Sequence, residues 1–138
     1  MILDLHVHFY RLGEMGVKWK DIPVDVQQAL ESSLLSCVKS MTVIDVSAVL
    51  TRSVGMDYRW YARSQIQTAL MGRIVELFRT EGKSGAIGRQ VANIIYGMGK
   101  GRMKTTDIPS EVLRALFDGI KSHATSFSEQ EVSNIIYG

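Results

Sequence analysis

The stretch VANIIYGMGKGRMKTTDIP, which runs from Val91 to Pro109, has a counterpart earlier in the same chain of 138 residues. The counterpart is LHVHFYRLGEMGVKWKDIP, from Leu5 to Pro23, which lies 86 positions upstream and matches at Tyr, Gly, Lys and the closing Asp-Ile-Pro. The shift also superimposes later residues: Val26, Ala29, Leu30, Val46 and Ser47 fall on Val112, Ala115, Leu116, Val132 and Ser133. Because the register holds over the whole unit, the chain is predicted to be built from repeats.

Each of these units is itself a pair of shorter repeats. A shift of 41 positions places EVSNIIYG (Glu131 to Gly138) on QVANIIYG (Gln90 to Gly97), with six of the eight residues identical. Repeats of about 40 to 45 residues have the length of two-helix solenoid repeats. The extra residues of the middle repeat fall in EGKSG, residues 81–85, where we expect a surface loop.

The apolar residues inside each repeat recur with the period of an α-helix. The spacing i, i+3, i+4, i+8, i+11, i+12 occurs over residues 26–38 and again over 66–78, and we call these segments A helices. A shorter apolar segment, such as residues 91–98, lies between them and is called a B helix. We therefore predict an all-α fold of about seven helices in the order B, A, B, A, B, A, B, stacked as antiparallel hairpins in an α-solenoid. We expect this fold to form a single domain over residues 1–138.

Proline, glycine and alanine refine this prediction. A proline fits the first turn of an A helix and an aspartate two residues earlier is placed to cap it, in the pairs Asp21 with Pro23 and Asp107 with Pro109. Glycines mark the ends of B helices, at Gly13, Gly16, Gly99 and Gly101. Small residues at three equivalent positions are expected to be buried where A helices approach their neighbours: Ala29, Ala69 and Ala115.

The last stretch, NIIYG, stops while its apolar face continues, so we expect part of a longer array or an end that docks on a partner.

The composition predicts a globular chain with no membrane span and no metal centre. Hydrophobic residues make up 46% and charged residues 22%, and no run of eighteen residues is apolar. Cys37 is the only cysteine, which excludes internal disulfides and the cysteine spacings of zinc sites. His6 and His8 resemble a metal-binding His-x-His pair, but on a helix their side chains point about 200° apart and do not share a metal.

Two glycine-containing stretches resemble phosphate-binding loops without meeting their requirements. GKS at residues 82–84 has Leu77 where the motif needs its first glycine, and GMGKG at residues 97–101 follows a predicted helix instead of a strand. We interpret both as helix ends or turns. The sequence predicts no enzymatic activity and no cofactor.

The basic residues gather at the junctions between B and A helices, although the net charge is only +2. Lys18, Arg59 and Lys104 occupy one aligned position, and the same junctions carry Lys20, Arg63, Lys100 and Arg102. Stacked repeats are expected to align these seven residues into a ridge that binds phosphate groups. The alternative is a set of solvated turns whose cations offset the dipoles of helix C-termini, and the sequence leaves both interpretations open.

Two asparagines and two tryptophans also recur in the repeat. Asn93 and Asn134 are interpreted as structural residues that hydrogen-bond a neighbouring helix or turn, since base-reading residues should differ between repeats. The weaker candidates for base recognition are Arg11, Arg52, Asn93 and Asn134. Trp19 and Trp60 are interpreted as wedges between successive hairpins.

The B helices QVANIIYGMGK and EVSNIIYG resemble helices of the octotricopeptide repeat family and of its relatives, the heptatricopeptide repeats and the helical regions of proteins with RAP domains. The resemblance covers nearly the whole chain and is clearest at residues 90–100 and 131–138. Val7 and Ala48 stand where the family has an asparagine, and no RAP domain is visible.

This resemblance implies an RNA-associated helical-repeat protein of the mitochondrion or plastid that binds single-stranded or ribosomal RNA. The implied roles are RNA processing, stability or translation, or membership of an organellar ribosome, with ribosomal or other organellar proteins as partners and no DNA. No transit segment is visible before Asp4, so we expect any targeting peptide to have been removed or to lie outside this sequence. The competing interpretation is a protein-interaction scaffold of a large organellar complex without direct RNA contact, because two-helix repeats also bind peptides and subunits.

Overall fold

The computed structural model describes residues 8, 11–60, 64–81 and 86–137, and within these ranges the regular elements are all helices. They are α2 (Val24–Cys37), α3 (Val43–Ser53), α4 (Gln65–Glu81), α5 (Ala86–Lys100), α6 (Ser110–His123) and α7 (Glu129–Tyr137), and residues 11–14 are helical as well. Short 3-10 helices connect them: η1 (Trp19–Asp21), η2 (Val38–Ser40), η3 (Val54–Met56) and η4 (Thr105–Asp107). The predicted all-α fold is confirmed.

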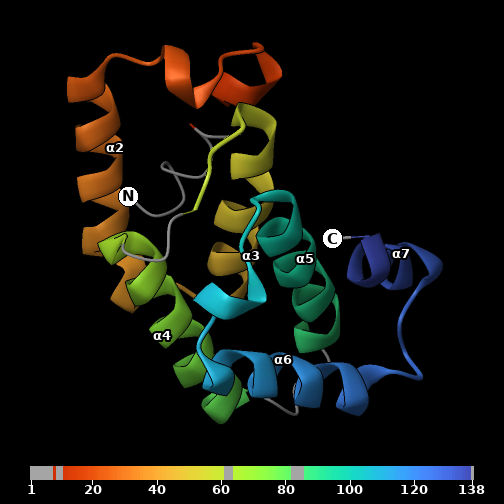
Figure 1. The fold of residues 1–138 in the computed structure, drawn as a ribbon. Coiled ribbons are helices and arrows are strands. Elements are labelled where there is room, and N and C mark those ends of the chain that lie inside the picture. Colours follow the sequence, from red (N-terminus) through yellow and green to blue (C-terminus); the bar gives the residue numbers. More distant parts are fainter. Residues whose placement is uncertain (1–7, 9–10, 61–63, 82–85, 138) are drawn as a thin grey trace.

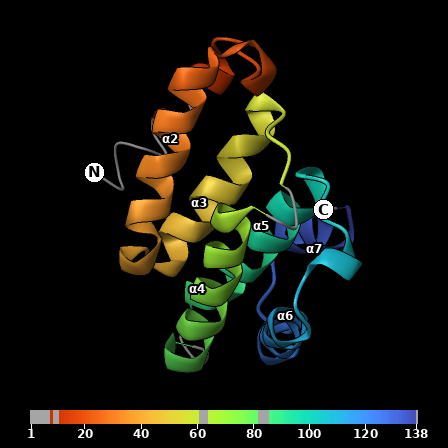
Figure 2. The ribbon, with the colours of Figure 1, turned by 60° about the vertical axis from the view of Figure 1, so that its left-hand side comes forward.

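The helices form two rows in which each helix packs against the next helix but one. The A helices α2, α4 and α6 contact one another in chain order, and so do the B helices α3, α5 and α7. In Figure 1 the A helices follow the left and lower edge of the molecule, and the B helices lie to their right. Figure 2 shows α6 nearly along its axis while α2, α3 and α4 run up the picture, so the A row turns at its last helix.

The contact between α3 and α5 is the most extensive one between helices. Its centre is apolar, because Val46, Leu50, Val91 and Ile94 are fully buried. Gly97 permits a close approach, since a Cβ atom at this position would lie 2.7 Å from the backbone carbonyl carbon of Leu50. Helix α5 also contacts α6 and α7. Both helices of the second half of the molecule therefore pack against α5.

A buried polar pair crosses the same interface. The hydroxyl of Ser47 on α3 donates a hydrogen bond to the side-chain oxygen of Gln90 on α5, and both residues are buried. Such a pair adds geometric specificity to an apolar contact, because sliding one helix along the other leaves a buried acceptor without its donor.

Three details differ from the sequence prediction. Ala29 is exposed and Ala69 and Ala115 are only half-buried, because larger residues such as Leu34 and Leu70 fill the A row. Asp21 and Asp107 do not cap the A helices, since they close the preceding 3-10 turns and the proline itself takes the N-cap position. Helix α5 has 15 residues against 14 in α2, so the B helices are not all shorter than the A helices.

The stretch EGKSG extends into residues 82–85, which lie outside the described ranges, and so does Arg63. Across the described helices, none is both long enough and apolar enough to cross a lipid bilayer.

The close approach at Gly97 predicts a difference between two helical glycines. Replacing Gly97 with Ala places a methyl group against the backbone of Leu50 and is expected to lower the free energy of unfolding by about 1 to 3 kcal/mol. Replacing Gly72 in α4 with Ala, where a Cβ atom meets nothing within 4 Å, should raise the free energy of unfolding by up to about 1 kcal/mol. Urea unfolding of both variants measures the difference, and equal stabilities would contradict the packing of α3 on α5.

Candidate nucleic-acid interface

The three B-to-A junctions share one backbone conformation, although their sequences differ. At each junction one residue adopts the left-handed conformation: Gly16 (φ 77°), Asp57 (φ 54°) and Arg102 (φ 63°). The shift between the first two is 41 positions, as in the sequence repeat, and each stands two residues before an aligned cation. The repeat therefore exists in the backbone as well as in the sequence.

Backbone hydrogen bonds at these junctions have the pattern of a Schellman motif. In the first, the N–H of Val17 donates to the carbonyl of Leu12, and the N–H of Gly16 donates to the carbonyl of Gly13. The second and third junctions repeat both bonds, as Tyr58 to Ser53, Asp57 to Val54, Met103 to Met98 and Arg102 to Gly99. Two of the last carbonyls of each B helix are thus satisfied by the backbone.

The junctions are also tied to one another. The Nζ atom of Lys18 donates to the carbonyl of Gly55 at 3.3 Å and lies 3.4 Å from a carboxylate oxygen of Asp57, which links the first junction to the second. The backbone N–H of Trp60 donates to the carbonyl of Gly101 at 3.5 Å, which links the second junction to the third. Residues far apart in the sequence are therefore held in one surface region.

A groove of about 610 Å³ opens where the three junctions meet. Five of the seven predicted phosphate-binding residues line it, and they come from all three junctions: Lys18, Lys20, Arg59, Lys100 and Arg102. Among the described residues of its lining, Asp57 is the one carboxylate, and the neutral part of the wall comes from Val54, Trp19 and Tyr58. We call this surface the junction groove.

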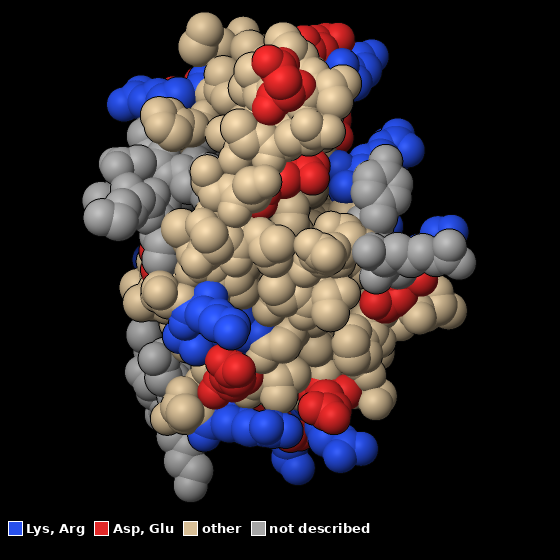
Figure 3. Space-filling view, turned by 90° about the vertical axis from the view of Figure 1, so that its left-hand side faces the viewer, with Lys and Arg blue, Asp and Glu red and all other residues tan. Residues whose placement is uncertain are grey.

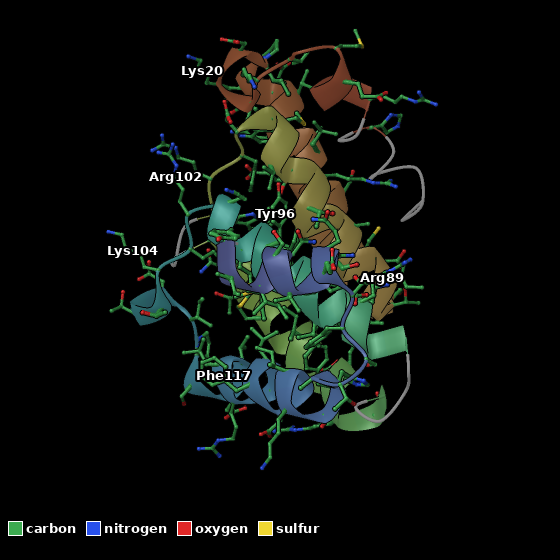
Figure 4. The ribbon with its side chains drawn as sticks, turned by 90° about the vertical axis from the view of Figure 1, so that its right-hand side faces the viewer. Lys20, Arg89, Tyr96, Arg102, Lys104 and Phe117 are labelled. Carbon is green, nitrogen blue, oxygen red and sulfur yellow. The ribbon has the colours of Figure 1, made fainter. Side chains whose placement is uncertain are left out.

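The two remaining candidates lie elsewhere. Lys104 is exposed and does not line the junction groove, but Figure 4 shows that it follows Lys20 and Arg102 down the same edge of the molecule. Arg63 lies outside the described residues. By contrast, the face over α2 consists mostly of residues that are neither acidic nor basic, interrupted by patches of both signs (Figure 3).

The aromatic residues at the junctions are packed, as predicted for wedges. Trp60 is buried, and a Cβ atom at Gly101 would lie 2.5 Å from its indole ring. Tyr58 stands between the two tryptophans, with its ring centroid 4.8 Å from that of Trp19 and 4.8 Å from that of Trp60, both edge to face. These contacts hold the first two junctions against the third.

The candidates for base recognition do not line the junction groove. The side chain of Asn134 on α7 donates to that of Asn93 on α5 at 3.5 Å, so these two residues join neighbouring B helices, as their structural interpretation predicts. Gln130 donates to Asn134 at 2.9 Å and fixes its orientation. A guanidinium nitrogen of Arg11 lies 3.6 Å from a carboxylate oxygen of Glu14, and Arg52 is half-buried on α3.

Sequence reasoning missed Asp57 and Tyr58 as parts of the groove. The signal for Asp57 is its alignment with Gly16, because glycine, asparagine and aspartate are the residues that tolerate the left-handed conformation best. Tyr58 follows the left-handed residue, at the place where the Schellman motif accepts a hydrophobic contact.

Comparisons of this chain with protein-family models, with curated proteins and with solved structures each found no match. The resemblance to the octotricopeptide repeats therefore rests on the residues quoted above.

The contact between Asn93 and Asn134 predicts a coupled loss of stability. Asn93→Leu removes the acceptor of the Asn134 amide and should lower the free energy of unfolding by about 1 kcal/mol. Asn134→Leu should have a similar effect, and the double variant should lose less than the sum of the two. Urea unfolding of the four proteins completes the cycle. Unchanged stability together with weaker RNA binding would assign Asn93 to base recognition instead.

Proposed function

We propose that this chain is an RNA-associated helical-repeat protein that binds single-stranded RNA through the junction groove. The observation that carries the proposal is the convergence of five cationic side chains from three repeats, with one carboxylate, in a single groove. Lysine and arginine side chains around a groove attract phosphate groups and favour a chain that carries one charge at every link.

The backbone of the junctions weakens the alternative interpretation of these cations. Cations at a helix C-terminus are favourable when they face unsatisfied carbonyl groups. Here the Schellman hydrogen bonds satisfy two of the last four carbonyls at each of the three junctions, and at the second junction the carbonyl of Gly55 accepts from Lys18. Lys18 therefore takes part in ending a helix, whereas the exposed side chains of Lys20, Arg59 and Arg102 are available to an anionic partner.

RNA is favoured over other anionic partners by the resemblance of the B helices to octotricopeptide repeats, as is a site of action in the mitochondrion or plastid. The contacts that the groove offers are to the sugar-phosphate backbone, so they give affinity without sequence preference. A scaffold that holds ribosomal or other organellar proteins without touching RNA is the competing function, and the salt dependence of binding distinguishes the two.

Removing three exposed groove cations should weaken RNA binding and flatten its salt dependence. For Lys20→Ala/Arg59→Ala/Arg102→Ala, we expect the slope of log affinity against log salt to fall by about 2, because each neutralised phosphate of a single strand adds about 0.7 to that slope. The measurement is the fluorescence anisotropy of labelled oligouridine over a potassium chloride series.

A matched control removes the same charge from the A row. The variant Arg79→Ala/Arg114→Ala/Lys121→Ala changes three exposed cations of α4 and α6 and should leave both affinity and slope nearly unchanged. Equal decreases in affinity for the two triple variants would mean that binding depends on net charge alone. No binding of the intact chain at low salt would favour the scaffold function.

Two left-handed residues allow charge and stability to be separated. Arg102→Gly and Asp57→Gly both place glycine at a left-handed position. The change favours folding by up to about 1 kcal/mol for Arg102→Gly and by less for Asp57→Gly, because aspartate already tolerates this conformation and Lys18 loses its ion pair. Arg102→Gly should nevertheless weaken oligouridine binding, because the groove loses a cation. Asp57→Gly should strengthen it, because the groove loses its carboxylate. Thermal unfolding and anisotropy measured together check the pair, and effects of the same sign on binding would count against an anion site.

A further inference from the structure

The last B helix, α7, presents an uncovered apolar stripe. Val132, Ile136 and Tyr137 are 42%, 66% and 72% exposed. The opposite side of α7 is occupied, because Asn134 contacts Asn93 and Glu131 lies 3.9 Å from Arg89 of α5. Helix α7 is therefore held in place on α5 while its apolar stripe faces outward.

The position of Val132 is covered in the two preceding B helices. Val132 corresponds to Val46 of α3 and Val91 of α5, and both of these valines are 0% exposed. In α5, the covering element is the A helix that follows it, α6. Its Gly119 approaches so closely that a Cβ atom there would lie 2.8 Å from a methyl carbon of Val91.

The end of this covering helix identifies a second feature of the contact. His123, four residues after Gly119, packs beside Gly88 at the start of α5, where a Cβ atom would lie 3.2 Å from the histidine side chain. The residue of α7 that corresponds to Gly88 is Glu129, which is exposed and acidic. A helix seated on α7 as α6 is seated on α5 thus meets a carboxylate where His123 meets glycine.

We propose that the stripe Val132, Ile136 and Tyr137 docks one amphipathic helix of a protein partner. This helix carries a small residue at its centre, against Val132, and a basic residue four positions later, against Glu129. The occupant is inferred from the α5–α6 contact in the same molecule, which seats such a helix on the equivalent residues. The site lies on a different element from the junction groove and does not depend on RNA binding.

The probe for this site is a capped peptide of residues 109–124, which is the sequence of α6 with its N-cap proline. Added to the isotope-labelled full chain, it should shift the amide resonances of α7. Ile136→Asp should reduce its affinity about tenfold or more, because a large buried side chain is replaced by a charge. Ile44→Asp, at an exposed isoleucine of α3, is the matched control and should leave the affinity unchanged.

Two peptide variants test the partner chemistry. Gly119→Leu in the peptide should abolish binding, because the side chain would occupy the space of Val132. His123→Lys in the peptide should tighten binding about threefold, and this gain should disappear in the Glu129→Gln chain. Equal binding of all peptides, or equal binding to Ile136→Asp, would overturn the proposal.

A second measurement tests the site even if the free peptide does not form a helix in solution. Residues 98–123 are appended to the full chain after Gly138, which continues the register because Gly138 corresponds to Gly97. If the stripe accepts a helix, the appended segment gains helical circular dichroism and protease resistance, and Ile136→Asp removes both. An appended segment that stays unprotected overturns the proposal, as does sedimentation that shows a second copy of the chain covering the stripe.

Discussion

The contact of α5 with α3 at Gly97 is the constraint on which the rest of the molecule depends. Because the glycine has no side chain, the backbone of α5 lies against Leu50, and fully buried residues such as Val46 and Ile94 surround the contact. Helices α6 and α7 in turn pack against α5. The polar pair of Ser47 and Gln90 fixes the register in which this happens.

That register also sets the geometry of the junction groove. The second junction leaves the end of α3 and the third leaves the end of α5, so the packing of these two helices decides how far apart their cations stand. The bond from Trp60 to Gly101 and the buried indole ring keep the two junctions together. Helix packing in the interior and charge on the surface are therefore linked through three short turns.

Much of this arrangement follows from the sequence, because a repeat predicts its own elements. The helical period predicts the A and B helices. The aligned cations Lys18 and Arg59, together with the unaligned cations at the same junctions, predict five residues of the junction groove. The failures are local. The position of Ala29 holds alanine in all three aligned repeats, yet its exposure depends on which neighbouring side chains fill the A row. Arginine disfavours the left-handed backbone conformation that Arg102 adopts, so its sequence alone does not predict this conformation. The Schellman motif that all three junctions share accounts for it.

The two-row architecture has a consequence for how the molecule opens. Helix α5 is supported by helices on several sides, whereas α7 packs chiefly on α5 and α2 buries only Leu34. Amide protons of α5 should then exchange with solvent only when the whole chain unfolds, while those of α2 and α7 exchange through local fraying. We therefore expect α5 to be the most rigid of the described helices, and α2 and α7 to change their positions at a lower cost in free energy than α5.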